Sequence, residues 1–125
     1  MVQTERKSFR FLGFTVLVEL RDNPPEGFLE KTAGGCFDDP DDKGRFRVWF
    51  LGDLPPLKVI SHECWHLYMT ILGYMDTHEH TFEELNNEIY AYNFNILFEN
   101  VLTLLFSMKR YQKAAMEDEE KREVD

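Results

Sequence analysis

The chain has 125 residues, of which 43% are hydrophobic and 30% charged, and its formal net charge is −9. This balance predicts a single domain, 1–116, followed by an acidic disordered tail, 117–125, that carries six acidic residues against two basic ones. The acidic charge argues against a nucleic-acid partner, and no apolar stretch is clean enough to indicate a membrane span. Two cysteines are too few for a disulfide framework, so we expect a reducing, cytoplasmic setting.

Two segments in the first half of the chain have the composition of strands. Residues 9–21 are rich in phenylalanine, valine and leucine, which predicts one strand with a bend at Gly13. Residues 45–51 alternate, with Phe46, Val48 and Phe50 on one face and polar or larger side chains on the other. Whether 27–37 adds a further strand stays undecided. We therefore expect a small antiparallel sheet.

Two long helices are predicted to follow. Pro55-Pro56 suits the first turn of a helix over 57–72, and Gly73 is a plausible C-terminal stop. A second helix is predicted over 81–109, because it opens on the capping box Thr-Phe-Glu-Glu. The connector between them is short, so the helices should pack roughly antiparallel. The expected class is α+β, with the sheet packed on two long helices.

The pentapeptide 62–66, His-Glu-Cys-Trp-His, lies within the first predicted helix. Two histidines four residues apart project from the same helical face, where two imidazole nitrogens can hold one zinc ion. Glu63 is one step round the helix from His62, a position from which it can act as general base on a water at the metal. Cys64 lies about half a turn away, so we expect a small core residue there rather than a ligand.

A catalytic zinc takes three protein ligands, and the second helix offers the third. Leu85, Ile89, Tyr92 and Ile96 recur at helical spacing and predict a stripe that faces the core. Glu88 flanks that stripe, and a carboxylate half inside an apolar face must be paired or bound to a metal. Three further candidates remain open, of which the capping-box glutamate is weaker because it has another role: Glu84, His78 and His80.

His62-Glu63-Cys64-Trp65-His66, followed by Asn87-Glu88 and then Ala91-Tyr92, resembles a minimal zincin of the gluzincin type. The pattern is similar to that of small HExxH proteins encoded by bacteriophages and prophages. The resemblance implies zinc held by His62, His66 and Glu88, a water activated by Glu63, and a strand before the motif helix beside the cleft. Segment 45–51 has the right order in sequence for that strand. The chain departs from larger peptidases, which have Ser-Asp where Ala91-Tyr92 stands and a second domain across the cleft.

These observations predict a zinc-dependent hydrolase, most simply a metallopeptidase acting on a peptide or protein substrate. Tyr92, one turn beyond Glu88, is a candidate for stabilising a developing oxyanion, with a core tyrosine as its alternative. The competing hypothesis is a non-enzymatic protein with a structural or vestigial zinc site that binds a host protein. Beyond Asn95 the second helix is apolar nearly all round, so it is either the central element of the fold or the seam of a homodimer.

Overall fold

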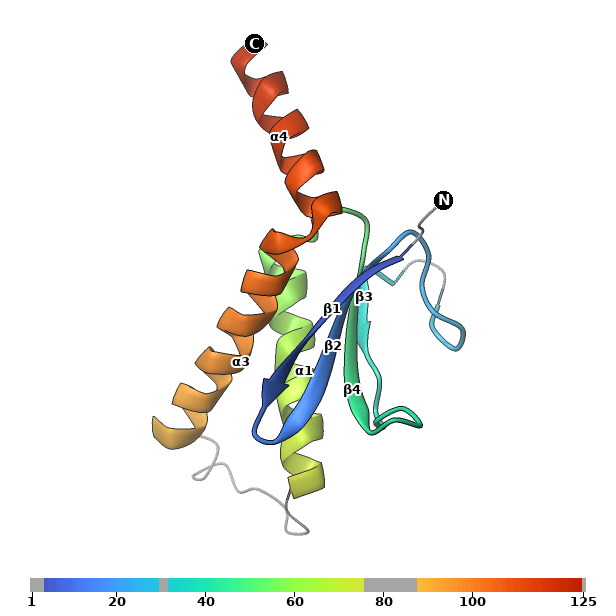
Figure 1. Ribbon diagram of the computed structural model, residues 1–125, viewed down its shortest axis with the longest axis vertical. Coiled ribbons are helices and arrows are strands. Elements are labelled where there is room, and N and C mark those ends of the chain that lie inside the picture. Colours follow the sequence, from blue (N-terminus) through green and yellow to red (C-terminus); the bar gives the residue numbers. More distant parts are fainter. Residues whose placement is uncertain (1–3, 30–31, 76–87, 125) are drawn as a thin grey trace.

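The computed structural model describes residues 4–29, 32–75 and 88–124, which form a four-stranded sheet and three helices (Figure 1). The predicted α+β class is confirmed. The strand order across the sheet is β1-β2-β4-β3. The elements are β1 (Thr4–Phe11), β2 (Phe14–Arg21), β3 (Gly34–Cys36), β4 (Arg45–Leu51), α1 (Leu57–Met75), α3 (Glu88–Ser107) and α4 (Lys109–Val124).

The sheet is mixed, which corrects the expectation of an antiparallel sheet. The segment predicted as one bent strand is a hairpin of β1 and β2, turned by Leu12 and Gly13, both of which have positive φ (49° and 85°). Two such residues form the kind of tight turn whose twist matches paired strands. β2 then pairs parallel with β4, and β3 pairs antiparallel with β4. The parallel pairing is possible because residues 22–44 return the chain to the other end of the sheet.

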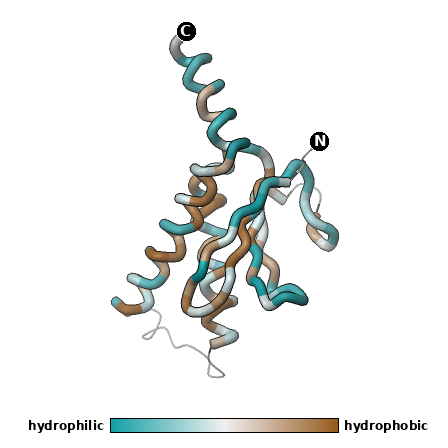
Figure 2. The backbone as a smooth tube through the Cα atoms, in the orientation of Figure 1, coloured by the Kyte–Doolittle hydropathy of each residue, from teal (hydrophilic) through white to brown (hydrophobic). Residues whose placement is uncertain are grey.

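The two helices α1 and α3 cover one face of the sheet (Figure 1). α1 packs on β3 and β4, and α3 packs on β1 and β2. The inward face predicted for β4 is confirmed, since Phe46, Val48 and Phe50 enter the core between sheet and helices. Trp49, on the other face, is also fully buried, with its ring against that of Phe28. In Figure 2 the apolar stretches of α1, α3 and the inner strands face one another, whereas α4 is largely hydrophilic. None of the described helices is long and apolar enough to cross a membrane.

α1 begins at Leu57, directly after Pro55-Pro56, as predicted. It does not stop at Gly73 but continues to Met75. A helix stop by glycine needs the left-handed conformation, and Gly73 is not among the residues with positive φ. The second predicted helix has its proposed start, Thr81, outside the described residues.

The end of α3 differs from the prediction. α3 ends at Ser107, and a separate helix, α4, runs from Lys109 to Val124 through most of the segment expected to be a disordered tail. Lys7 of β1 donates to the Ser107 carbonyl (3.1 Å), and the Glu5 carboxylate accepts from the Lys109 and Arg110 backbone N–H groups (both 2.9 Å). A cation thus meets the C-terminus of one helix and an anion the N-terminus of the next, as helix dipoles favour.

Candidate active site

The His62 and His66 side chains lie one turn apart on α1, and each borders a hollow that residues of β3 also line. Their Nε2 atoms are 3.2 Å apart, and both rings are exposed. Two ligands at about 2.0–2.1 Å from a tetrahedral zinc lie about 3.3 Å from each other. The spacing of the two nitrogens therefore fits a shared tetrahedral metal ion, and neither ring has to move far to bind one.

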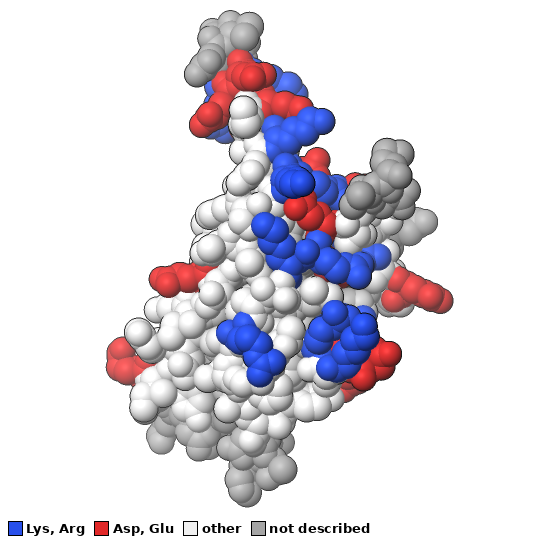
Figure 3. All heavy atoms as spheres, viewed as in Figure 1, with Lys and Arg blue, Asp and Glu red and all other residues white. Residues whose placement is uncertain are grey.

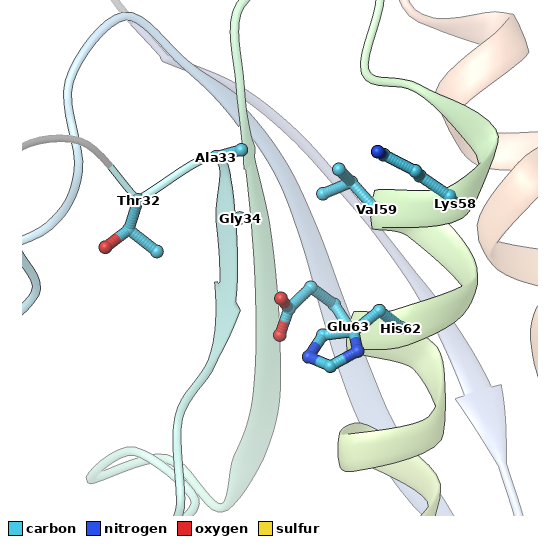
Figure 4. A pocket seen from close by; sticks show the side chains of 7 residues that line it. All are labelled: Thr32, Ala33, Gly34, Lys58, Val59, His62 and Glu63. Atoms are coloured by element: carbon cyan, nitrogen blue, oxygen red, sulfur yellow. The ribbon is translucent and has the colours of Figure 1, made fainter.

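Glu63 points into the space between α1 and β3, with the His62 ring beside it (Figure 4). Its half-buried carboxylate borders a cavity of about 440 Å³ that is also lined by His62, Lys58, Val59 and residues 32–34. A second hollow, of about 270 Å³, is lined by Glu63 and His66 together with β3. The base and both histidines predicted from the motif thus share one region of the surface.

Gly34 explains how closely α1 approaches β3. A Cβ at this position would lie 3.1 Å from Cγ1 of Val59 and 3.2 Å from Cδ1 of Phe50. Both distances are shorter than ordinary carbon contacts. A larger residue would push the helix away from the strand, so the glycine brings the motif face of α1 against β3.

The strand beside the site is β3, which corrects the assignment of segment 45–51 to that place. β4 is an internal strand, paired with β2 on one side and with β3 on the other, so it has no free edge for a ligand. β3 is the last strand of the sheet and pairs with β4 alone among the described strands. Its three residues include Gly34 and Gly35, a composition too short and too small to give a strand pattern.

α3 packs on a different flank of α1 from the one that carries the histidines. The Tyr68 hydroxyl donates to the Tyr90 carbonyl (2.8 Å), and the Trp65 and Phe94 ring centroids are 5.5 Å apart. In the described part of the chain, no three His, Cys, Asp or Glu side chains come close enough to hold one metal ion. The structure therefore does not bring Glu88, exposed at the first residue of α3, beside the histidine pair.

The stripe predicted to face the core from the second helix is confirmed at Ile96, which is half-buried against the core, and wrong at Ile89 and Tyr92. Ile89 is 68% exposed and Tyr92 is 66% exposed. The buried residues of α3 are instead Leu97, Val101 and Leu105. Packing follows these positions, so Glu88 does not flank an apolar face, and Tyr92 lines neither hollow beside Glu63. The other candidate ligands, Glu84, His78 and His80, lie outside the described residues.

The two thiols lie in the seam between β3 and α1. Burial raises the pKa of Cys36 to about 12; a hydrogen bond with Thr70 opposes the rise, and the Glu63 and Asp38 carboxylates add to it. Burial also raises the pKa of Cys64 to about 12, with further contributions from Cys36 and Glu63. Both groups are therefore neutral thiols at neutral pH, and Cys64 is the buried core residue that its helical position predicted.

No protein-family model, curated protein or solved structure matches this chain.

Proposed function

We propose that this protein is a zinc-dependent hydrolase that cleaves peptide bonds, with His62 and His66 as metal ligands and Glu63 as general base. One observation carries the proposal. The two Nε2 atoms are 3.2 Å apart, a tetrahedral ligand spacing, and Glu63 borders two hollows, one lined by His62 and the other by His66. The free thiols of Cys36 and Cys64 agree with a reducing, cytoplasmic setting.

Glu88 stays our proposed third ligand, because two imidazoles leave a catalytic zinc one protein ligand short. Its position at the exposed first residue of α3 means that its carboxylate has to approach the histidine pair when metal binds. Glu88→Gln keeps the shape and removes the charge, so zinc affinity should fall. Glu84→Gln is the matched comparison and should change it much less.

Zinc, when bound, would supply a Lewis acid that polarises a carbonyl and lowers the pKa of a water. Glu63 would accept a proton from the attacking water and return it to the leaving amine. Its place on α1 suits this role, because it is one residue from His62 and its carboxylate lies between α1 and β3, beside the His62 ring (Figure 4). Lys58, at the border of the same cavity, adds a positive charge there.

An extended peptide is the substrate that the surroundings of Glu63 suit. β3 is an edge strand, and an edge strand offers unpaired backbone groups to a peptide that adds to the sheet. The cavity of about 440 Å³ next to it is bordered by Ala33, Gly34 and Val59, so its wall is largely apolar. A substrate side chain that points toward α1 would enter this cavity.

The alternative is a non-enzymatic protein that binds a host or partner protein and whose zinc site is structural or vestigial. The observation that favours it is the absence of a three-ligand group among the described residues. Two histidines alone are one protein ligand short of the three that a catalytic zinc site has.

Glu63→Gln separates the two functions. A general base contributes about 10²–10⁴-fold in rate, so this variant should lose peptide hydrolysis by about that factor and keep its zinc content. Cleavage of a mixed peptide pool, followed by mass spectrometry, measures the first, and metal analysis measures the second. Ser61→Ala, two residues before Glu63 on the same helix, is the control. Hydrolysis, or a cellular effect of the protein, that survives Glu63→Gln undiminished would contradict the enzymatic proposal and support the alternative.

A further inference from the structure

Arg47 lies on the face of the sheet that the helices do not cover. Lys and Arg side chains gather over this side of the strands in Figure 3. Arg47 is half-buried, and its guanidinium carbon stacks 3.7 Å from the centroid of the Phe37 ring. Its Nε–H is buried and has no hydrogen-bond acceptor among the residues that the structure describes. A buried donor of a charged group is unfavourable when it is unpaired, and this one needs an explanation.

The other half-buried arginines of the described chain all have a carboxylate partner. Arg21 pairs with Glu19 at 3.2 Å, and Arg45 pairs with Asp41 at 2.8 Å. Arg110 pairs with two aspartates, Asp22 and Asp53. Arg47 is the exception among these four, although the chain has 23 acidic residues. Its contact with Phe37 satisfies the face of the guanidinium but none of its five N–H donors.

Arg47 borders a hollow of about 530 Å³, within the roughly 300–1,000 Å³ range of ligand sites. Phe28, Phe37 and Pro40 line part of it, and Glu26, Asp38 and Asp39 line the rest. The Asp39 carboxylate accepts from the Tyr74 hydroxyl at 2.7 Å, and all three acids are exposed. None of them is hydrogen-bonded or ion-paired to Arg47 in the described structure. The guanidinium thus has open donors beside a space large enough for a ligand.

We propose that this hollow binds a carboxylate carried by a peptide, and that Arg47 receives it. A guanidinium matches a carboxylate with two parallel N–H donors, which gives both strength and direction. The same chemistry comes from an aspartate or glutamate side chain or from a C-terminal carboxylate.

The hollow adjoins the candidate active site across β3. It shares Phe28, Cys36 and Asp38 with the smaller hollow that Glu63 and His66 line. Successive side chains of an extended peptide point to opposite faces of a sheet. A peptide added to β3 would thus place one side chain toward α1 and the next toward Arg47. This link to the substrate rests on the proposed function, whereas carboxylate binding by Arg47 does not.

The three exposed acids around the hollow restrict which peptides fit. They repel further negative charge, so a single carboxylate with neutral or basic neighbours should bind better than a run of acidic residues. The expected ligand is an otherwise uncharged or basic peptide with one acidic group.

The test uses the full chain with the Glu63→Gln substitution, so that the probe is not cleaved. Three peptides of identical length are titrated: one with blocked ends and a central glutamate, one with glutamine in its place, and the glutamine peptide with a free C-terminal carboxylate. Binding is followed by NMR through the backbone amide signals of the residues that line the hollow, which are present in every variant. Where Arg47 is present, its Nε–H signal reports the contact with the guanidinium. The comparison of the first and third peptides distinguishes a side-chain from a terminal carboxylate.

We expect a carboxylate peptide to bind about tenfold or more tightly than the blocked glutamine peptide. Arg47→Gln should remove that preference, and Arg47→Lys, which keeps the charge but loses the fork, should lose most of it. Arg10→Gln is the control, because Arg10 is exposed and its hydrogen bonds within the described chain go to Thr15 and Gly13 of its own hairpin. Equal binding of all three peptides, no binding at millimolar concentration, or an unchanged preference in both Arg47 variants would overturn the proposal. That outcome would leave the proposed zinc site and the proposed hydrolysis standing.

Discussion

Two regions of the molecule differ in how their polar groups are paired: the joint between α3 and α4, and the seam between α1 and β3. At the joint, Lys7 of β1 donates to the Ser107 hydroxyl at the end of α3, and the Glu5 carboxylate accepts from the Arg110 backbone N–H at the start of α4. The Arg110 guanidinium donates to the Asp53 carboxylate, after β4, and to the Leu20 carbonyl of β2. At the seam, the His62 and His66 rings are exposed, and in the described part of the chain they are hydrogen-bonded to each other alone. Paired groups stabilise a fold, whereas unpaired groups that converge are available to a ligand. From this contrast we propose a structural role for the joint and a binding role for the seam.

The largest expected effect is the response of the seam to zinc. A ligand that binds only the folded state stabilises it by about 2.7 kcal/mol at 100 times its dissociation constant. Wild-type protein should therefore gain roughly this free energy of unfolding when zinc is added, measured by denaturant titration. The His62→Ala, His66→Ala double variant should gain almost nothing. An equal gain in the double variant would place the metal elsewhere.

Substitution at the joint should lower the stability of the protein without changing its zinc binding. Arg110→Met removes ion pairs with Asp22 and Asp53 and a hydrogen bond to the Leu20 carbonyl, from a side chain that is 18% exposed. We expect a loss of about 2 kcal/mol in the free energy of unfolding, with zinc binding unchanged. Arg122→Met is the matched control, because its pair with Asp118 is on the surface and should contribute less than about 0.5 kcal/mol. If the two variants lose equally little, the joint is not a structural anchor.

A smaller effect is expected at Gly73, which the structure places inside α1 rather than at its end. A Cβ there meets no atom within 4 Å. Gly73→Ala should stabilise the protein by about 0.5–1 kcal/mol, because alanine loses less conformational freedom in a helix. Denaturant titration measures the change. Destabilisation would show that Gly73 ends the helix in solution, as the sequence suggested.

The parts of the fold that depend on local patterning were predictable. Alternation predicted the buried face of β4, and Pro55-Pro56 predicted the start of α1. The position of Cys64 half a turn from the histidines predicted its burial. Each of these rests on a periodicity or a terminal signal within a few residues.

The parts of the fold that depend on contacts between distant residues could not be predicted from the sequence. The break at Met108 is stabilised by Glu5 and Lys7, about 100 residues earlier in the chain, and no local signal marks it. Ile89 and Tyr92 have the spacing of a core stripe, yet α3 turns a neighbouring set of positions toward the core. The parallel pairing of β2 with β4, and the edge position of β3, depend on how a long connection crosses the sheet.

The same limit applies to the candidate site. The motif predicted both histidines and Glu63 from spacing alone, because a single helix fixes their relative positions. The third ligand was assigned from the burial expected of a second helix, and that burial is not observed. Arg47 could not have been singled out from sequence, since only the structure shows that it lacks a carboxylate partner.

Zinc X-ray absorption on the purified protein tests the central claim most directly, because it identifies the ligand atoms around the metal. We predict about one zinc per chain, two imidazole nitrogens at about 2.0–2.1 Å and one carboxylate oxygen that disappears in Glu88→Gln. The His62→Ala, His66→Ala double variant should lose the metal. A coordination shell without imidazole, or the same shell and zinc content in the double variant, would contradict the account.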